Sequence, residues 1–569
     1  MKKIIFSFSI ILLLASSGLF AQTWTPTFIN TGGGTIYDLA SNSSPQWVAQ
    51  DKNNPSNIHA VIMSSPLGDP STYPGRRTKY FYSSNMGTNW TFINNINDRK
   101  SGFCSIMLAS DGCAFICNHG STTTNTTTRI LLYKDVYPGL GSFEIFDPPL
   151  NTYFFGKFCL TSSITATTKV IVMGQTMTSD STSRATGYPS WSSWIPFGNC
   201  GRESYCGALG QDGRIGITYI QNSFVETDYR SVYFIESTNN GLTFSAPLKI
   251  YLAVFTGSGA DSLAAFRGLS IAYKGNIPCI TFETIKQDPI AGDYFQKAPA
   301  KIRFWANDLP GTDPNRSIAV AGQSNVPIPS PDSIKTGVND QLGTLSRPVV
   351  GVSSDNNTIF IVFQAFTNRW GGTPPDTTNF KALYITKATN NYYFSKPYKF
   401  TPDGPLKDWS FPSISVWNDR NTNTLYANVC ALRDSIPGAY PNSTNNGQSW
   451  AELYYVRLAT NHTIGINENL TNTLTYSLSQ NYPNPFNPIT IIKFDLPKSN
   501  FTLSKSKGQL VQLKIFDITG KEIQTLVNEQ LQPGTYEVTF NGINLPSGIY
   551  YYKLQSDWFS DVKKMVLLK

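Results

Sequence analysis

The chain has 569 residues, of which 40% are hydrophobic, 13% are aromatic and only 14% are charged. This length argues for two or more domains, and so much aromatic surface can fill a large core, which excludes a disordered chain. The formal net charge of +8 comes without a long Lys/Arg run, and there are only three histidines, so we expect no nucleic-acid partner, no metal site and no cofactor.

Residues 1–21 have the pattern of a signal peptide. Lys2 and Lys3 form a positive start, an apolar stretch runs from Ile4 to Leu14, and Ala21 offers a small residue for cleavage. The apolar run is shorter than the ~20 residues of a spanning helix. No later segment is apolar enough to cross a membrane, so we expect no transmembrane span after the signal is removed.

The middle of the chain, residues 22–460, contains a repeated pattern. An apolar strand, a polar tight turn and a second apolar strand recur about seven times, as in Cys104–Met107 followed by Cys113–Ile116. A sheet-forming period of roughly 50–60 residues is typical of a β-propeller. The sequence therefore predicts an all-β propeller of about seven four-stranded blades. Six is the alternative, because the copy near Phe155 is faint.

Two turns in this region share the pattern Ser-x-Asn-x-Gly-x-x-aromatic. The Asn side chain can bond the amides of its own turn, the glycine permits a positive φ, and the aromatic residue is expected to be a buried plug. The residues concerned are Ser83, Asn85, Gly87 and Trp90 in the first turn, and Ser237, Asn239, Gly241 and Phe244 in the second. The region resembles the Asp-box (BNR) propellers, which include sialidases, other glycoside hydrolases and non-catalytic sortilin-type receptors. The resemblance implies the fold and leaves the function open.

Basic residues precede several of the predicted inner strands, which begin at the face where propellers bind ligands. They are Arg202, Arg267, Arg347 and Lys100. A guanidinium offers two parallel donors to a carboxylate or sulfate, so these residues predict an anion-binding site, similar to the arginine triad of sialidases. The alternative is that each is a solvated loop residue or pairs with a neighbouring acid.

The residues that could supply catalysis are few. Glu226, Asp228 and Tyr229 form a polar cluster between strands, and Glu283 follows an inner strand. Paired carboxylates could act as acid and base, but the Arg-Ile-Pro opener that the sialidase resemblance requires is missing. We therefore predict a non-catalytic propeller that binds a glycan or a surface protein. A secreted glycoside hydrolase acting on an acidic glycan is the alternative.

Eight cysteines fit an exported protein. Cys200 and Cys206 flank a short segment and form the candidate disulfide, and Cys104 and Cys117 could face each other across a hairpin. No Cys-x-x-Cys pair occurs, which disfavours a redox motif.

The last part of the chain, residues 477–569, is expected to be a small antiparallel β-sandwich behind a linker at 461–476. Strand-like runs such as Ile489–Phe494 and Tyr536–Phe540 follow a proline-spaced opener at 480–488. The opener, Phe516–Lys521 and the end from Lys563 resemble the C-terminal sorting domain of the type IX secretion system. The resemblance implies recognition by that machinery and passage through the periplasm to the outer cell surface or the medium.

Overall fold

The computed structural model describes residues 24–37, 39, 41, 43–121, 127–149, 152–161, 169–176, 181–187, 190–222, 230–253, 263–287, 295, 297–309, 317–335, 342–372, 374, 377–389, 392–438, 448–461, 477–496, 509–531, 534–556 and 559–569. The predicted signal peptide and nearly all of the predicted linker lie outside these ranges. Among the residues described, no helix is long and apolar enough to cross a membrane.

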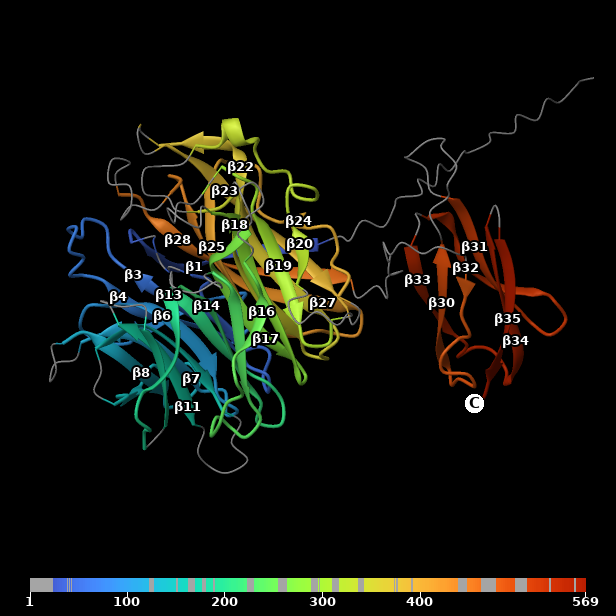
Figure 1. The fold of residues 1–569 in the computed structure, drawn as a ribbon, viewed down its shortest axis with the longest axis horizontal. Helices are drawn as coiled ribbons and strands as arrows, with labels where there is room; N and C mark the ends of the chain where they lie inside the picture. Colours follow the sequence, from blue (N-terminus) through green and yellow to red (C-terminus); the bar gives the residue numbers. More distant parts are fainter. Residues whose placement is uncertain are drawn as a thin grey trace, which may run out of the picture.

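The described strands before residue 462 form a β-propeller of seven blades, each a four-stranded antiparallel sheet around a common centre. Figure 1 shows the blades following one another in chain order, from blue to orange. The predicted all-β propeller is confirmed, with the higher of the two expected blade numbers.

The first three blades are listed from the inner strand outward. Blade 1 contains β2 (Val48–Gln50), β3 (Ile58–Ser64), β4 (Arg77–Ser83) and β5 (Thr91–Asn95). Blade 2 contains β6 (Ser101–Leu108), β7 (Ala114–Gly120), β8 (Arg129–Asp135) and β9 (Phe143–Phe146). Blade 3 contains β10 (Tyr153–Leu160), β11 (Val170–Thr176), β12 (Ser181–Gly187) and the first part of β13 (Ile195–Leu209).

The other four blades follow in the same order. Blade 4 contains the second part of β13, β14 (Ile215–Gln221), β15 (Val232–Ser237) and β16 (Leu248–Tyr251). Blade 5 contains β17 (Leu263–Lys274), β18 (Ile277–Lys286), β19 (Lys301–Ala306) and β20 (Ile318–Ala321), and a 3-10 turn, η1 (Pro331–Ser333), comes after it. Blade 6 contains β21 (Leu345–Ser353), β22 (Ile359–Gly371), β23 (Thr378–Ala388) and β24 (Tyr398–Lys399), with β26 (Trp417–Asn418) beside β21. Blade 7 contains β25 (Asp408–Ile414), β27 (Thr424–Asp434), β28 (Ala451–Asn461) and β1 (Trp24–Thr35).

The first strand of the chain completes the last blade. β1 pairs with β28 in antiparallel register, from Trp24 opposite Thr460 to Thr35 opposite Ala451, and the two lie side by side in Figure 1. This pairing joins the two ends of the propeller segment and covers an edge that would otherwise offer unpaired backbone groups.

The long strand β13 belongs to two blades. Its first residues pair with β12 as the outer strand of blade 3, and from Cys200 onward it pairs with β14 as the inner strand of blade 4. The strand is continuous between the two roles, although Gly198, Asn199 and Gly201 are residue types common in turns.

Burial separates inner from outer strands. Every residue of β3 and β14 is buried, because these strands have neighbouring strands on both edges and neighbouring blades on both faces. The outer strands β5 and β9 contain no buried residue. The interior strands β3 and β14 are therefore buried along their whole length, unlike the strands at the rim.

The remaining strands form the predicted β-sandwich with a core of its own. One sheet contains β29 (Ser477–Leu478), β30 (Ile489–Leu496) and β33 (Gly534–Asn541), and the other contains β32 (Glu522–Leu531), β31 (Gln509–Phe516), β34 (Gly548–Ser556) and β35 (Phe559–Leu567). β30 alternates exposed and buried residues, as expected for a strand with one face on a core.

The predicted Cys200–Cys206 disulfide is wrong, because all eight cysteines are free thiols. Both residues lie on β13, where an extended chain advances about 3.3 Å per residue, whereas disulfide-bonded Cα atoms lie roughly 5.5 Å apart. Cys104 and Cys117 are also free and buried, although they lie on the paired strands β6 and β7. Burial raises the pKa of Cys104 to about 12, so its thiol stays protonated.

The two Ser-x-Asn-x-Gly turns make the same hydrogen bonds. Ser83 Oγ accepts the Gly87 amide at 2.9 Å, and Ser237 Oγ accepts the Gly241 amide at 2.9 Å. Trp90 and Phe244 are half-buried and not the full plugs expected. They lie at blade boundaries, where Trp90 packs against Tyr455 at 5.2 Å between ring centroids.

Candidate binding site at the propeller mouth

Six inner strands contain a bulge at the same level of the propeller. In each, antiparallel register is interrupted and resumes two residues after one position. These positions are occupied by Phe103, Phe155, Glu203, Arg267, Arg347 and Phe411. We call these six residues the mouth, because they lie at the starts of strands that surround the common centre.

The mouth is conformationally strained. Apart from Arg267, each of its residues has a positive φ between 51° and 56°. Bulky side chains rarely adopt this left-handed region, at a cost of about 1–3 kcal/mol per residue. Such bulges re-aim side chains and occur often beside functional sites. In the sequence, four of these positions are an arginine or phenylalanine before Gly or Pro: Phe155-Gly156, Arg267-Gly268, Arg347-Pro348 and Phe411-Pro412. This pattern could have predicted the bulges, whereas the strand and turn pattern alone does not.

Several bulge amides are capped by a side chain from the preceding blade. Gln364 Oε1 accepts the Phe411 amide at 2.9 Å, and His119 Nδ1 accepts the Phe155 amide at 3.5 Å. These polar side chains satisfy amides that the bulge removes from the sheet ladder, and a buried donor left unpaired is costly.

Glu283, one of the four catalytic candidates, belongs to this capping set. Its carboxylate accepts the Arg267 amide at 3.2 Å and the Arg347 amide at 2.5 Å, linking blades 5 and 6. Burial raises the pKa of Glu283, while these amides and the Arg347 guanidinium oppose the rise. These contacts indicate a structural role for Glu283, which connects the bulges of two neighbouring blades. The other candidates, Glu226, Asp228 and Tyr229, lie outside the described residues.

Arg347 is buried and held by internal acceptors. Its Nη1 donates to the carbonyls of Ser41 and Ser43 at 2.8 and 2.6 Å, and its guanidinium stacks on the Phe411 ring at 4.2 Å. Only 2% of the residue is exposed. Among the predicted ligand-binding residues whose side chains are described, Arg347 is therefore the one with a buried, internal role.

The chain between β1 and β2 lies against three mouth strands. Ser41 Oγ donates to Glu203 Oε2 at 3.3 Å, Ser43 Oγ to the Arg267 carbonyl at 2.6 Å, and Ser44 Oγ to the Pro348 carbonyl at 2.6 Å. The connection thus touches the bulges of blades 4, 5 and 6 and fixes that side of the mouth.

Arg267 and Lys100 remain partly or largely exposed. Arg267 is half-buried, with its guanidinium 5.0 Å from the Phe266 ring. Lys100 is exposed at the entrance to β6, and its ammonium donates to the Thr72 carbonyl. Arg202 lies on β13 one residue before Glu203, so it is out of phase with Arg267 and Arg347, and its side chain is outside the described set.

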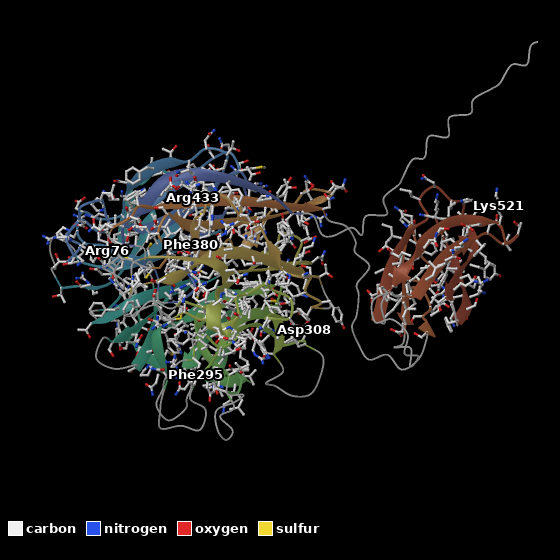
Figure 2. The ribbon with its side chains drawn as sticks, turned by 90° about the horizontal axis from the view of Figure 1, so that it is seen from above. Arg76, Phe295, Asp308, Phe380, Arg433 and Lys521 are labelled. Atoms are coloured by element: carbon white, nitrogen blue, oxygen red, sulfur yellow. The ribbon has the colours of Figure 1, made fainter. Side chains whose placement is uncertain are left out.

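The mouth has a charged and an aromatic side. On the charged side, Lys157 Nζ lies 3.6 Å from Glu203 Oε1, with both side chains buried. On the aromatic side, the rings of Phe103, Phe155 and His119 lie 5.0–5.6 Å apart. Arg76, labelled in Figure 2, lies on the loop before β4 with its guanidinium 5.7 Å from the Phe103 ring.

The comparisons identify the export domain. Residues 480–568 match the family model described as a secretion system C-terminal sorting domain. The protein is therefore an exported β-propeller that leaves the cell through the type IX system, to the cell surface or outside. No curated protein matches the sequence.

Three solved structures are similar to this chain at low sequence identity. A polysaccharide lyase of family PL25, an ulvan lyase, has 10% identity, covers 74% of this chain and 95% of its own, and gives a TM-score of 0.41. The six-bladed lectin of the fungus Aleuria aurantia has 11% identity, 61% and 94% coverage and a TM-score of 0.32. A variant of NanB sialidase from Streptococcus pneumoniae has 10% identity, 76% and 70% coverage and a TM-score of 0.33. These likenesses concern architecture, and the activities named belong to those proteins.

Proposed function

We propose that this exported propeller is a non-catalytic protein that binds an acidic glycan at its mouth, with Arg267 as the principal contact. The single observation that carries the proposal is the ring of strained bulges. Strain repeated in blade after blade is retained when the conformation serves a site, because each instance lowers stability. Export to the cell surface supports a ligand that is found outside the cell.

The charge of the mouth favours an anionic ligand. Arg267 is half-exposed on the bulge of blade 5, and Lys100 is exposed at the entrance of blade 2. A guanidinium can form two charge-assisted hydrogen bonds to one carboxylate or sulfate. The acids of the mouth, Glu203 and Glu283, are buried and engaged by Lys157 and by backbone amides.

The engagement of Glu283 supports binding over hydrolysis. A general acid or nucleophile must reach the substrate, whereas this carboxylate is 2% exposed and bridges two bulge amides. The hydrolase alternative would have to draw on Glu226, Asp228 and Tyr229.

The test combines a glycan array with calorimetry on the purified exported protein. Arg267→Ala should weaken binding of acidic oligosaccharides about tenfold or more, because charge-assisted bonds are lost. Arg267→Lys should weaken it less but measurably, since an ammonium lacks the planar fork. Arg214→Ala is the matched control, as Arg214 is a half-exposed arginine in the turn at the far end of β13 and β14.

Two outcomes would overturn the proposal. Equal affinity of wild type and Arg267→Ala, or selection of neutral glycans alone, would remove the anion site at the mouth. Release of reducing sugar from a bound glycan would contradict the proposal of a non-catalytic protein and favour the hydrolase alternative.

A further inference from the structure

A cavity lies between blades 6 and 7, and none of the six mouth residues lines it. It measures about 260 Å³ and is bounded by β22, β23, the β24–β25 connection and the start of β25. This volume is just below the ~300–1,000 Å³ of pockets for drug-sized ligands, so it suits one charged sugar ring or a similar small group.

The rim of this cavity is basic. Arg369, Lys399 and Lys407 line it, and Asp403 is the only acid among its lining residues. Asp403 forms an ion pair with Lys399, and its pKa is lowered by that lysine and more weakly by Arg369. Lys381 also lines the cavity, but its ammonium lies 2.8 Å from the buried carboxylate of Asp408, so that charge is compensated. The rim keeps an excess of positive charge.

The floor of the cavity is aromatic. Phe380, labelled in Figure 2, Tyr384 and Trp409 line it from β23 and β25, and each is under a tenth exposed. Trp370, next to Arg369 on β22, has 56% of its surface exposed. Sugar-binding pockets combine apolar ring faces with a few polar groups that fix orientation.

We propose that this cavity is a second saccharide site, one that takes a sugar bearing a carboxylate or a sulfate ester. The aromatic floor receives the ring, and Arg369 and Lys407 hold the anion at the rim. The site is independent of the mouth, since none of its lining residues belongs to the bulges of the inner strands. Two anion sites on different blades let one exported chain hold two points of the same acidic polymer, which raises apparent affinity by effective concentration.

The experiment uses the exported protein with the mouth disabled by Arg267→Ala, and titrates a uronate oligosaccharide, a sulfated oligosaccharide and a neutral one of equal length. Binding of a charged oligosaccharide should remain and should weaken about tenfold in Arg369→Ala or Lys407→Ala added to this background. The two charged ligands distinguish carboxylate from sulfate recognition. Lys396→Ala is the control, because Lys396 is exposed on the β23–β24 connection and does not line the cavity.

Asp403→Asn gives the opposite sign and tests the charge argument directly. Removing the one lining carboxylate releases Lys399, so affinity for the charged ligand should rise severalfold. A merely damaged surface would not produce a gain. The cavity proposal is overturned if the Arg267→Ala protein binds no charged oligosaccharide, if the Arg369 and Lys407 variants bind as well as Lys396→Ala, or if the neutral ligand binds equally. The same pocket variants are also made in the wild-type background. The cavity proposal can then be judged even if the mouth proposal fails.

Discussion

At the scale of single residues, polar groups at the propeller centre act as structural partners. His119 accepts one bulge amide, Gln364 another and Glu283 two. Each satisfies a donor that cannot reach water, which is why these polar residues occur within otherwise apolar strands. His119 and Glu283 are of residue types that suggest catalysis, but here their side chains accept hydrogen bonds from backbone amides.

The titration of His119 follows from this role. Burial, with Arg76 and Lys100 as secondary causes, lowers the pKa of His119 to about 3, while the unfolded chain titrates near ~6.5. The folded state therefore excludes a proton that the unfolded state binds, so stability is complete above about pH 6.5 and falls with acidification, by ~1.4 kcal/mol per pH unit.

His119→Asn should remove that slope. Urea unfolding of both proteins at pH 7, 6, 5 and 4 should show wild type losing more stability than the variant as the pH falls. Asp408, whose pKa is raised to about 6 by burial, contributes the opposite slope over part of this range, but it is common to both proteins and cancels. Parallel pH profiles would contradict the prediction.

At the scale of elements, the two Ser-x-Asn-x-Gly turns, which connect the third and fourth strands of blades 1 and 4, make close contacts with the preceding blade. A Cβ added to Gly87, which has φ +80°, would lie 2.0 Å from Tyr455 of blade 7. A Cβ added to Gly241, with φ +79°, would lie 2.5 Å from Ile171 of blade 3. Glycine is needed at both turns for its backbone conformation and for the approach of the preceding blade.

Gly87→Ala and Gly68→Ala separate these two requirements. Gly68 also has a positive φ, +77°, but nothing lies within 4 Å of its added Cβ. We expect Gly68→Ala to cost about 1 kcal/mol for the backbone alone. Gly87→Ala should cost roughly 1–3 kcal/mol more, because the Tyr455 ring is packed in place. Equal unfolding free energies for the two variants would contradict this prediction, because they would show that the Tyr455 ring can move aside at little cost.

The elements were largely predictable from the sequence, and the site was only partly so. Apolar runs and turns predicted the blades, because a strand that is buried on both faces requires a long apolar stretch. The mouth depends on bulges, which shift the register by a residue without changing composition, so Arg202 and Arg267 look equivalent in the sequence although Glu203 is the residue aligned with Arg267. The guanidinium of Arg347 is held by the carbonyls of Ser41 and Ser43, about 300 residues away in the chain. Local sequence patterns cannot predict contacts of this separation.

At the scale of the whole molecule, the sandwich is the export signal and the propeller is its cargo. The family match covers residues 480–568, and the sandwich core uses residues from both of its sheets. Deleting Val511–Lys569 removes β31, β32, β34 and β35 and β33 between them, so the remainder cannot form the recognised fold.

The protein that lacks Val511–Lys569 should accumulate in the periplasm of its host. Fractionation with an antibody against the propeller should find it there, while the full chain reaches the surface or the medium. Protease resistance of the periplasmic propeller serves as the folding control. A resistant propeller that still appears outside the cell would show that the sandwich is not the export signal.

The pairing of β1 with β28 also sets an order of events in time. Thr31 and Leu453, which it brings together, are 422 residues apart in the chain, so the last blade forms only after nearly all the propeller has been synthesised. Contacts of such separation slow folding, because chain entropy is lost before they stabilise the fold. β1 begins at Trp24, three residues beyond the predicted cleavage point at Ala21. With the predicted signal peptide still attached, this short spacing would hold β1 close to the membrane, so we expect cleavage to precede closure of the ring.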